Sequence, residues 1–329
     1  MSTASSRLVA YTDYVFPDVS GERVLLAQAG AELLENQSRS EDDVIAGCAD
    51  AEALIVQLAP VTARVIEALP RCRMMVRLGI GYDNIDVPAA EARGIAVCNV
   101  PDYCTGEVAD HTLALALALV RELSPIDARV RAGEWKLSPV RQLPALDRLT
   151  FGTVGFGRIA QAVLHRAKAF GCRLVASDPF VPAEVFAAQE VERVNLDDLC
   201  QQADILSLHA PYTPETHHLL NAARLAQLKP GAIVVNCARG ALIDTHALAR
   251  ALHAGRPAYA GLDVFEDEPL PLDHPLRSCP NALLTSHVAW LSDTSGPRLQ
   301  RLATEEVCRY LRGQPLRCPI NDAARAFAR

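Results

Sequence analysis

Short apolar runs with the length and composition of buried β-strands alternate with helical stretches along the whole chain. This alternation predicts parallel sheets whose strands are joined by right-handed helical crossovers. The 329 residues are enough for two domains. The sequence therefore predicts an α/β protein with two series of strands, at residues 8–10, 53–58, 74–78 and 96–100, and at residues 153–156, 173–178, 205–209, 232–237, 258–264 and 282–285.

A long helix is expected between the two series of strands. Thr105 is the predicted N-cap, and Leu and Ala on every side of the helix predict that it is buried all round, between domains or subunits. A polar, Pro-containing stretch at residues 136–148 follows and is interpreted as a surface linker.

Two later helices have clearer ends. The helix predicted at residues 245–253 has Asp244 as its N-cap and Gly255 as its C-terminal stop. A final helix, from about Pro297 to Leu311, is expected to return to the first domain. The second series of strands would then form a domain inserted within the other one.

Charge and cysteine usage narrow the class of protein. The chain has 32 Lys and Arg against 39 Asp and Glu, a net charge of −7, which disfavours a nucleic-acid or anionic-membrane surface. Ten scattered cysteines show no C-x-x-C pair and no metal-ligand spacing, so we expect reduced thiols and no metal site. Residues 1–7 are polar, and the longest strongly apolar run, 113–120, is too short to span a bilayer. We expect a cytoplasmic protein.

A glycine-rich turn follows the first strand of the second series. The residues Gly155, Phe156, Gly157, Arg158, Ile159 and Ala160 form a G-x-G-x-x-A pattern at the start of a helix. The two glycines allow a tight turn and a close approach to a pyrophosphate, and the helix N-terminus stabilises its charge. Such a turn alone often has no ligand, so the context decides.

The context is Asp178, which ends the next strand 21 residues after Gly157. A carboxylate at this point accepts hydrogen bonds from the adenosine ribose and repels a 2′-phosphate, which predicts NAD and makes NADP less favoured. The alternative is that Asp178 is only a turn residue before Pro179.

Three charged side chains each follow an apolar run, where open α/β sheets bind their ligands. Reduction of a 2-oxo acid needs a cation for the carboxylate and carbonyl oxygen, which Arg239 supplies. It also needs an acid, and the imidazole of His287 exchanges a proton near neutral pH, with Glu268 fixing its tautomer. Taken singly, each has an ordinary explanation: a strand-end ion pair, a core histidine, and part of an acidic run with Glu266 and Asp267.

With these residues the sequence resembles the D-isomer-specific 2-hydroxyacid dehydrogenases over essentially its whole length. The resemblance implies two Rossmann-like domains with the active site in the cleft: a doubly wound, parallel-sheet NAD domain (103–288) inserted into a smaller flavodoxin-like substrate and catalytic domain (1–102 with 289–329). It also implies a homodimer built on the long helix. The matching segments are residues 79–86, 155–160, 236–240, 263–269 and the segment around His287.

The resemblance also implies further site residues. Asp263 would lie beside the nicotinamide, although a capping or turn aspartate is the alternative. The loop of Arg77, Gly79, Ile80 and Gly81 would bind the substrate carboxylate with backbone N–H groups, although Arg77 could be only an exposed charge. The remaining residues predicted to bind the cofactor, besides Arg239 and His287, are His209, Pro211, Cys237 and Ala238.

Cys237 also suggests covalent catalysis, because its thiol lies beside the predicted site. The sequence places no base for it, and the family does not use one. Packing is therefore the favoured interpretation of Cys237.

Within the family, the segments 84–86, 94–101 and 287–290 resemble the C-terminal-binding-protein branch, together with Arg77 and Ser292. In that branch Trp290 would line the substrate pocket, and the alternative is a domain-interface aromatic. Two departures stand out: Ser286 replaces the Pro of many relatives, and no long Pro-rich tail of the animal corepressors follows, which weakens a purely regulatory interpretation.

The predicted function is NAD-dependent interconversion of a D-2-hydroxy acid and its 2-oxo acid. The alternative is an NAD(H)-sensing protein-interaction module like the C-terminal-binding-protein corepressors. Formate and phosphite dehydrogenases are disfavoured, because Glu268 stands where the former have an amide and Ile80 where the latter has a Lys. Glyoxylate-sized, branched, aromatic and sugar-derived acids all remain possible substrates.

Overall fold

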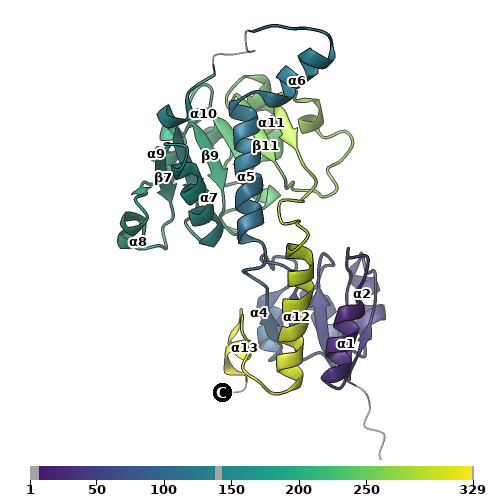
Figure 1. Ribbon diagram of the computed structural model, residues 1–329. Coiled ribbons are helices and arrows are strands. Elements are labelled where there is room, and N and C mark those ends of the chain that lie inside the picture. The colour runs from purple at the N-terminus through teal and green to yellow at the C-terminus, as the bar shows by residue number, and fades with distance from the viewer. Residues whose placement is uncertain (1–6, 138–142, 328–329) are drawn as a thin grey trace, which may run out of the picture. The chain divides into compact units, whose positions relative to one another are not determined.

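The computed structural model describes residues 7–137 and 143–327. The chain divides into two compact units, a first unit of residues 1–103 with 292–329 and a second unit of residues 104–291 (Figure 1). Each unit contains one sheet in which all strands are parallel. The predicted α/β class with two Rossmann-like sheets is confirmed. In the described part of the chain, no helix has the length and apolar character needed to cross a bilayer.

The sheet of the first unit has the flavodoxin-like order β2-β1-β3-β4-β5. β3 is buried along its whole length, as expected for a strand covered on both faces. The strands are β1 (Arg7–Tyr11), β2 (Ala31–Leu34), β3 (Ala53–Val56), β4 (Met74–Arg77) and β5 (Ala96–Cys98).

Helices cover the sheet of the first unit. The helix α12 (Ser295–Leu311) packs against α1 (Ser20–Gln28) and against β3 and β4, as Figure 1 also shows for α12 and α1. The short helix α13 (Asp322–Ala326) packs against β5. Apolar residues beneath three further helices form one core cluster with the strands, and these helices are α2 (Glu41–Cys48), α3 (Ala63–Ala68) and α4 (Val87–Ala92).

The sheet of the second unit has the order β12-β11-β10-β9-β6-β7-β8. β6 pairs with β7 on one side and with β9 on the other, so the strand order reverses between β6 and β9. Ligands of doubly wound sheets bind at this kind of switch point. The strands are β6 (Thr150–Val154), β7 (Arg173–Ser177), β8 (Glu192–Arg193), β9 (Ile205–Leu208), β10 (Ile233–Asn236), β11 (Tyr259–Leu262) and β12 (Ala282–Leu284).

Alternation along β11 shows how the second sheet is covered. A Cβ atom added at Gly261 would meet Leu115 and Leu119 of α5 (Thr105–Val120), so α5 lies almost against the backbone of β11. The neighbours of Gly261 along the strand, Ala260 and Leu262, belong to the core cluster on the other face of the sheet. Helix α7 (Arg158–Lys168) packs beside α5 (Figure 1). The face of the sheet with this core cluster is covered by α9 (Leu196–Gln202), α10 (Ala222–Gln227) and α11 (Thr245–His253).

The predicted ends of α11 are confirmed. The Asp244 side chain accepts a hydrogen bond from the Ala247 amide, as an N-cap does. At the other end Gly255 has φ +76°, its amide donates to Leu252, and the Arg256 amide donates to Ala251. This pair of bonds is a Schellman motif, which explains why glycine ends the helix.

The long helix α5 differs from its prediction. Its N-cap is Cys104, whose side chain makes no capping hydrogen bond, so the prediction of Thr105 as the cap is wrong. Asp110 and Ala114 of α5 are exposed in the single chain, so burial of α5 all round would need a second subunit and stays a prediction. These two residues are four apart and lie on one side of the helix.

Several elements escaped prediction, among them α13, which follows the helix predicted to be the last. The strands β2 and β8 are short edge strands, and β8 consists of two exposed charged residues with no apolar pattern. Helix α6 (Leu123–Arg131) has no buried residue, although its apolar side chains Leu123, Ile126 and Val130 recur at helical spacing. Of the predicted linker 136–148, residues 138–142 lie outside the described residues, and Leu146–Arg148 forms a 3₁₀ turn, η1. The remaining short elements are α8 (Ala183–Ala188), η2 (Gly240–Leu242) and η3 (Pro275–Ser278).

Candidate active site

The predicted site residues of the second unit lie at one edge of its sheet. Each follows the carboxyl end of a strand, and because all strands are parallel these ends lie along the same edge. The strands contribute, in sequence order, Gly155 to Ile159 after β6, Asp178 after β7, His209 and Pro211 after β9, Cys237 to Arg239 after β10, Asp263 after β11 and His287 after β12.

The glycine turn lies at the switch point between β6 and β9. Gly155 has φ +92°, and a Cβ there would lie 3.0 Å from the carbonyl carbon and oxygen of His209, so only glycine fits. Gly157 is the N-cap of α7, and a Cβ added there would meet open space. The turn therefore has the open helix N-terminus that a dinucleotide pyrophosphate requires.

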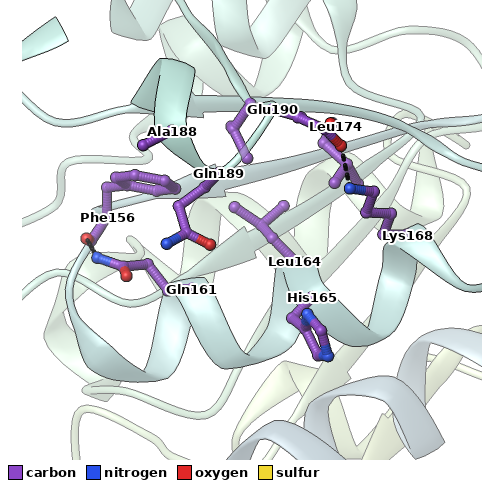
Figure 2. Close-up of a pocket in the computed structure, with 10 residues that line it drawn as sticks. Phe156, Gln161, Leu164, His165, Lys168, Leu174, Ala188, Gln189 and Glu190 are labelled. Atoms are coloured by element: carbon purple, nitrogen blue, oxygen red, sulfur yellow. Dashed lines mark hydrogen bonds and ion pairs between the residues drawn. The ribbon is translucent and has the colours of Figure 1, made fainter. Parts of the chain in front are cut away.

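Phe156 anchors the same turn through its side chain. Its ring stacks on Phe186 with centroids 4.1 Å apart, and its carbonyl accepts a hydrogen bond from the side-chain amide of Gln161 at 2.8 Å. Phe156 and Gln161 line a cavity of about 200 Å³. Figure 2 shows both residues there, together with the ion pair between Lys168 and Glu190. The Gln161 amide and this ion pair are engaged within the protein, so we assign this cavity to packing around the turn.

Asp178 is held against the glycine turn by two backbone amides. Its Oδ2 accepts from the Phe156 amide and its Oδ1 from the Phe180 amide, both at 2.9 Å. The second bond forms the turn around Pro179 that was the alternative interpretation. Each carboxylate oxygen can accept more than one hydrogen bond, so this turn is compatible with ribose binding, which stays a prediction.

His209 and Pro211 lie in the turn after β9. The Ser207 hydroxyl is 2.8 Å from His209 Nε2, and desolvation lowers the pKa of His209 to about 3, so the ring is neutral. The Pro211 carbonyl accepts a hydrogen bond from the Thr216 hydroxyl. A neutral imidazole beside the glycine turn adds no charge to the predicted cofactor site.

Arg239 lies in a loop that Asn236 and Gly240 hold in place. The buried side chain of Asn236 donates from Nδ2 to the Arg239 carbonyl at 2.8 Å, and its Oδ1 accepts from the backbone amide of Ala238 at 3.0 Å. A Cβ at Gly240 would lie 1.8 Å from the carbonyl carbon of Phe265, so the two backbones meet directly. The Arg239 loop is therefore fixed against the segment that leads to Glu268.

Cys237 is buried in the same loop, and desolvation raises the pKa of its thiol to about 12. A thiol that stays protonated at neutral pH is a poor nucleophile. The packing interpretation of Cys237 is therefore supported over covalent catalysis.

Glu268 and His287 form the hydrogen bond that the sequence predicts between them. His287 Nδ1 is 2.6 Å from Glu268 Oε2, and the other oxygen of Glu268 accepts from the Phe265 amide at 2.9 Å. The two side chains are 37% and 34% exposed, so the pair is accessible to a ligand. Because Nδ1 is bonded to the carboxylate, Nε2 is the ring nitrogen left to exchange a proton with a substrate.

Asp263 holds the turn that carries His287. It is fully buried, and its carboxylate accepts from the Thr285 hydroxyl at 2.6 Å, the Val288 amide at 3.0 Å and the Ala289 amide at 2.9 Å. His287 itself has φ +57°, a left-handed conformation that is unusual for histidine. These contacts match the alternative interpretation of Asp263 as a turn aspartate, and its role beside the nicotinamide stays a prediction.

His111 and Thr285 belong to this cluster and were missed from the sequence. His111 Nε2 lies 3.1 Å from the Thr285 hydroxyl and 3.6 Å from Asp263 Oδ1. The available signal was a single histidine in the first half of α5, two residues before its continuous apolar run.

The Arg77 loop of the first unit follows β4. Arg77 Nη1 donates to the Leu78 carbonyl at 2.9 Å, and the Gly79 amide donates to the Arg77 carbonyl at 2.9 Å. Asn99 donates to the Ile80 carbonyl at 2.6 Å. The Gly79 amide is thus occupied within the loop, which leaves the amides of Ile80 and Gly81 for the predicted anion. Trp290, in the second unit, is half-buried after Ala289.

Residues 113–289, more than half of the chain, match the family model described as "D-isomer specific 2-hydroxyacid dehydrogenase, NAD binding domain". The chain belongs to the D-isomer-specific 2-hydroxyacid dehydrogenase family. A glyoxylate reductase of Korarchaeum cryptofilum is 39% identical over 279 residues, which cover 84% of each chain. The family assignment made from the sequence is therefore confirmed.

Two further relatives define the extent of the similarity. A D-3-phosphoglycerate dehydrogenase of Methanocaldococcus jannaschii is 38% identical over 277 residues, 84% of this chain but only 52% of that enzyme, so the chain spans about half of its length. The structure of a D-lactate dehydrogenase of Aquifex aeolicus, complexed with NAD and lactic acid, has a TM-score of 0.85 and 29% identity over 93% of this chain and 96% of that one. The C-terminal-binding-protein branch stays a prediction.

Removal of the Asp263 carboxylate should release the His287 turn. In Asp263→Ala, two backbone amides and one hydroxyl lose their acceptor, and each such loss costs about 1–3 kcal/mol where the group is buried. We expect faster hydrogen exchange at the Val288 and Ala289 amides and a lower free energy of unfolding. Asp267→Ala, in an exposed part of the same loop, is the control. Unchanged exchange at these two amides in Asp263→Ala would contradict the role given to Asp263.

Proposed function

We propose that this family member is an NAD-dependent oxidoreductase that interconverts a D-2-hydroxy acid and its 2-oxo acid. The observation that carries the proposal is the 2.6 Å bond between Glu268 and His287. It lies at the carboxyl edge of the sheet, where the Arg239 loop is packed against the Glu268 segment through Gly240. A carboxylate–imidazole pair with an arginine in the adjoining loop is the set of groups that 2-oxo acid reduction needs.

Each side chain has one task in the proposed reaction. The nicotinamide, when bound, supplies the hydride to the carbonyl carbon. His287 donates the proton from Nε2 to the oxygen that becomes the hydroxyl, and it accepts this proton in the oxidative direction. Glu268 holds the Nδ1–H and stabilises the imidazolium, while Arg239 binds the carboxylate and the carbonyl oxygen.

The proposed substrates are small 2-hydroxy and 2-oxo acids. The relatives described above are named for glyoxylate, 3-phosphoglycerate and D-lactate, which share the 2-hydroxy or 2-oxo acid group. We propose the Arg77–Gly81 loop and Trp290 as the residues that contact the substrate beyond Arg239. Trp290 offers a flat apolar wall, which would favour a substrate side chain that can pack on it.

Turnover of 2-oxo acids tests the proposal. We expect NADH oxidation with at least one member of a panel of glyoxylate, pyruvate, branched, aromatic and phosphorylated 2-oxo acids. His287→Asn should lower kcat by about 10²–10⁴-fold because the acid is lost, while the asparagine tolerates the left-handed backbone. Arg239→Ala should lower kcat/KM through loss of the carboxylate contact.

The matched controls are His165→Asn and Arg173→Ala, two side chains of the second unit away from the candidate active site. Both should keep wild-type rates. Unchanged turnover in His287→Asn would refute the mechanism. Tight NADH binding without turnover of any acid would instead favour the NAD(H)-sensing alternative.

Cofactor preference tests Asp178. We propose that its carboxylate faces the adenosine ribose, so wild-type protein should prefer NADH to NADPH. In Asp178→Ala we expect the ratio of the two kcat/KM values to narrow by about ten-fold or more, because the repulsion of a 2′-phosphate disappears. The ratio is the relevant quantity, since loss of the Phe156 hydrogen bond affects both cofactors. Asp197→Ala, an exposed carboxylate on α9, should leave the ratio unchanged.

We further propose a homodimer that covers the exposed side of α5 and α6. Helix α6 has no buried residue, and Leu123 and Val130 on it are exposed, as is the following Trp135 at 81%. Exposed apolar side chains concentrated on one surface are typical of an interface. Light scattering should give twice the 35.5 kDa of one chain. Leu123→Glu with Trp135→Glu should give monomers, whereas Leu272→Glu, at another exposed apolar residue, should not; a wild-type monomer would refute the proposal.

A further inference from the structure

A cluster of polar side chains adjoins the catalytic pair but does not contact His287. It consists of Glu266, His218, Thr245 and His274, and we call it the Glu266 cluster. We propose that Glu266 is a positioning residue that fixes the segment carrying Glu268 relative to the Arg239 loop. The inference rests on the function proposed above and adds a residue for which the sequence offered only an acidic surface run.

Both oxygens of Glu266 are engaged. Oε1 lies 2.5 Å from His218 Nε2, and Oε2 accepts from the Thr245 amide at 3.0 Å and from the Thr245 hydroxyl. The side chain is only 26% exposed, in a loop whose backbone is open to solvent. A carboxylate with partners on both oxygens has little freedom to move, so its position is fixed by the elements that donate to it.

The hydrogen bonds of the cluster have a definite direction. His274 Nδ1 accepts from the Leu276 amide at 3.2 Å, so in the neutral ring the proton is on Nε2, 3.3 Å from the Thr245 hydroxyl. Burial and the neighbouring His246 lower the pKa of His274, which keeps the ring neutral. The Thr245 hydroxyl thus accepts from His274 Nε2 and donates its own proton to Glu266.

Glu266 is the acceptor at the end of this chain. Burial alone would raise the pKa of its carboxyl, but the hydrogen bonds from Thr245 and His218 outweigh burial and lower it. The group is therefore an ionised acceptor, and the direction of every bond in the cluster is consistent with that state.

Glu266 and its two partners lie on three separate segments. Thr245 begins α11, directly after the segment that contains Arg239 and Gly240. His218 lies in the connection after β9, has φ +47°, and its amide donates to the Ala241 carbonyl at 2.8 Å. Glu266 itself lies two residues before Glu268. One carboxylate thus links the segments on both sides of the Gly240 contact.

This link acts beside the contact at Gly240, where the Arg239 loop meets the segment that leads to Glu268. A Cβ at Gly240 would lie 2.4 Å from the Glu266 amide nitrogen, so the Arg239 loop and the Glu266 backbone are already in direct contact. A backbone contact of this kind resists compression but not separation, whereas the bonds from Glu266 to Thr245 and His218 resist separation. Together they would hold Arg239 and Glu268 at a constant spacing, which orientation of a bound acid requires.

Other roles for the cluster fit less well. Among residues 7–137 and 143–327, no three His, Cys, Asp or Glu side chains come together in a way that could hold a metal ion. The oxygens of Glu266 are bonded to Thr245 and His218, and the group in contact with His287 is Glu268. A proton-transfer role for Glu266 is therefore less consistent with the contacts than a positioning role.

The variants Glu266→Ala and Glu266→Gln test the proposal. Glutamine can still accept from Thr245 and donate to His218, so it should keep kcat within about three-fold of wild type, whereas alanine should lower kcat by about 10- to 100-fold. NADH affinity, measured by fluorescence, should stay within about two-fold in both variants. Glu192→Gln is the control, because Glu192 is an ion-paired glutamate on β8, at the opposite edge of the same sheet.

A readout without turnover separates this inference from the proposed function. The ring nitrogen signals of His287 in ¹⁵N NMR report its bond to Glu268, and they should shift in Glu266→Ala but not in Glu266→Gln or Glu192→Gln. If wild-type protein reduces no 2-oxo acid, the proposed function fails while these signals still test the positioning role.

Two results would overturn the positioning role. The first is an alanine variant with wild-type kcat and unshifted His287 signals. The second is a glutamine variant as impaired as the alanine variant, since then the charge of Glu266 would matter and not its bonds. If Glu266→Ala does not fold, His218→Ala serves instead, because it removes the hydrogen bond to Glu266 Oε1 and leaves those from Thr245. We then expect a smaller loss of kcat with the same NADH affinity.

Discussion

The common direction of the strands in the second unit is the constraint on which its candidate site depends. Because all seven strands are parallel, every carboxyl end lies at one edge, and six turns bring polar residues to it. Residues more than a hundred positions apart, such as Gly155 and His287, thereby share one edge of one sheet. The crossover helices carry the apolar burial on both faces, which leaves the turns available for chemistry.

Side chains without their own chemistry hold these turns in shape. Asn236 bonds to the backbone of Ala238 and Arg239, and Asp263 bonds to three groups around His287. The direct contact between Gly240 and Phe265 adds a steric limit that no hydrogen bond supplies. The proposed reactive groups would thus be held by a rigid frame of buried amide and carboxylate groups.

The sequence predicted the fold class, the family and the Glu268–His287 bond, because each depends on local pattern or motif spacing. Asp244 and Gly255 were predicted as helix ends for the same reason. The strand β8 was missed because it consists of only two residues, both charged. The contacts of Asp263 with the His287 turn were not predictable, since its partners lie more than twenty residues further along the chain and become neighbours only when β11 and β12 pair.

The left-handed backbone of His287 restricts how this position can diverge. Asparagine and glycine adopt such a conformation readily, whereas β-branched residues and proline do not. Histidine and asparagine codons differ by a single base, so one nucleotide change can remove the acid while the Asp263-held turn keeps its shape. A relative that retains the nucleotide fold but has lost chemistry is therefore only one mutational step away, and asparagine at this position would be its signature.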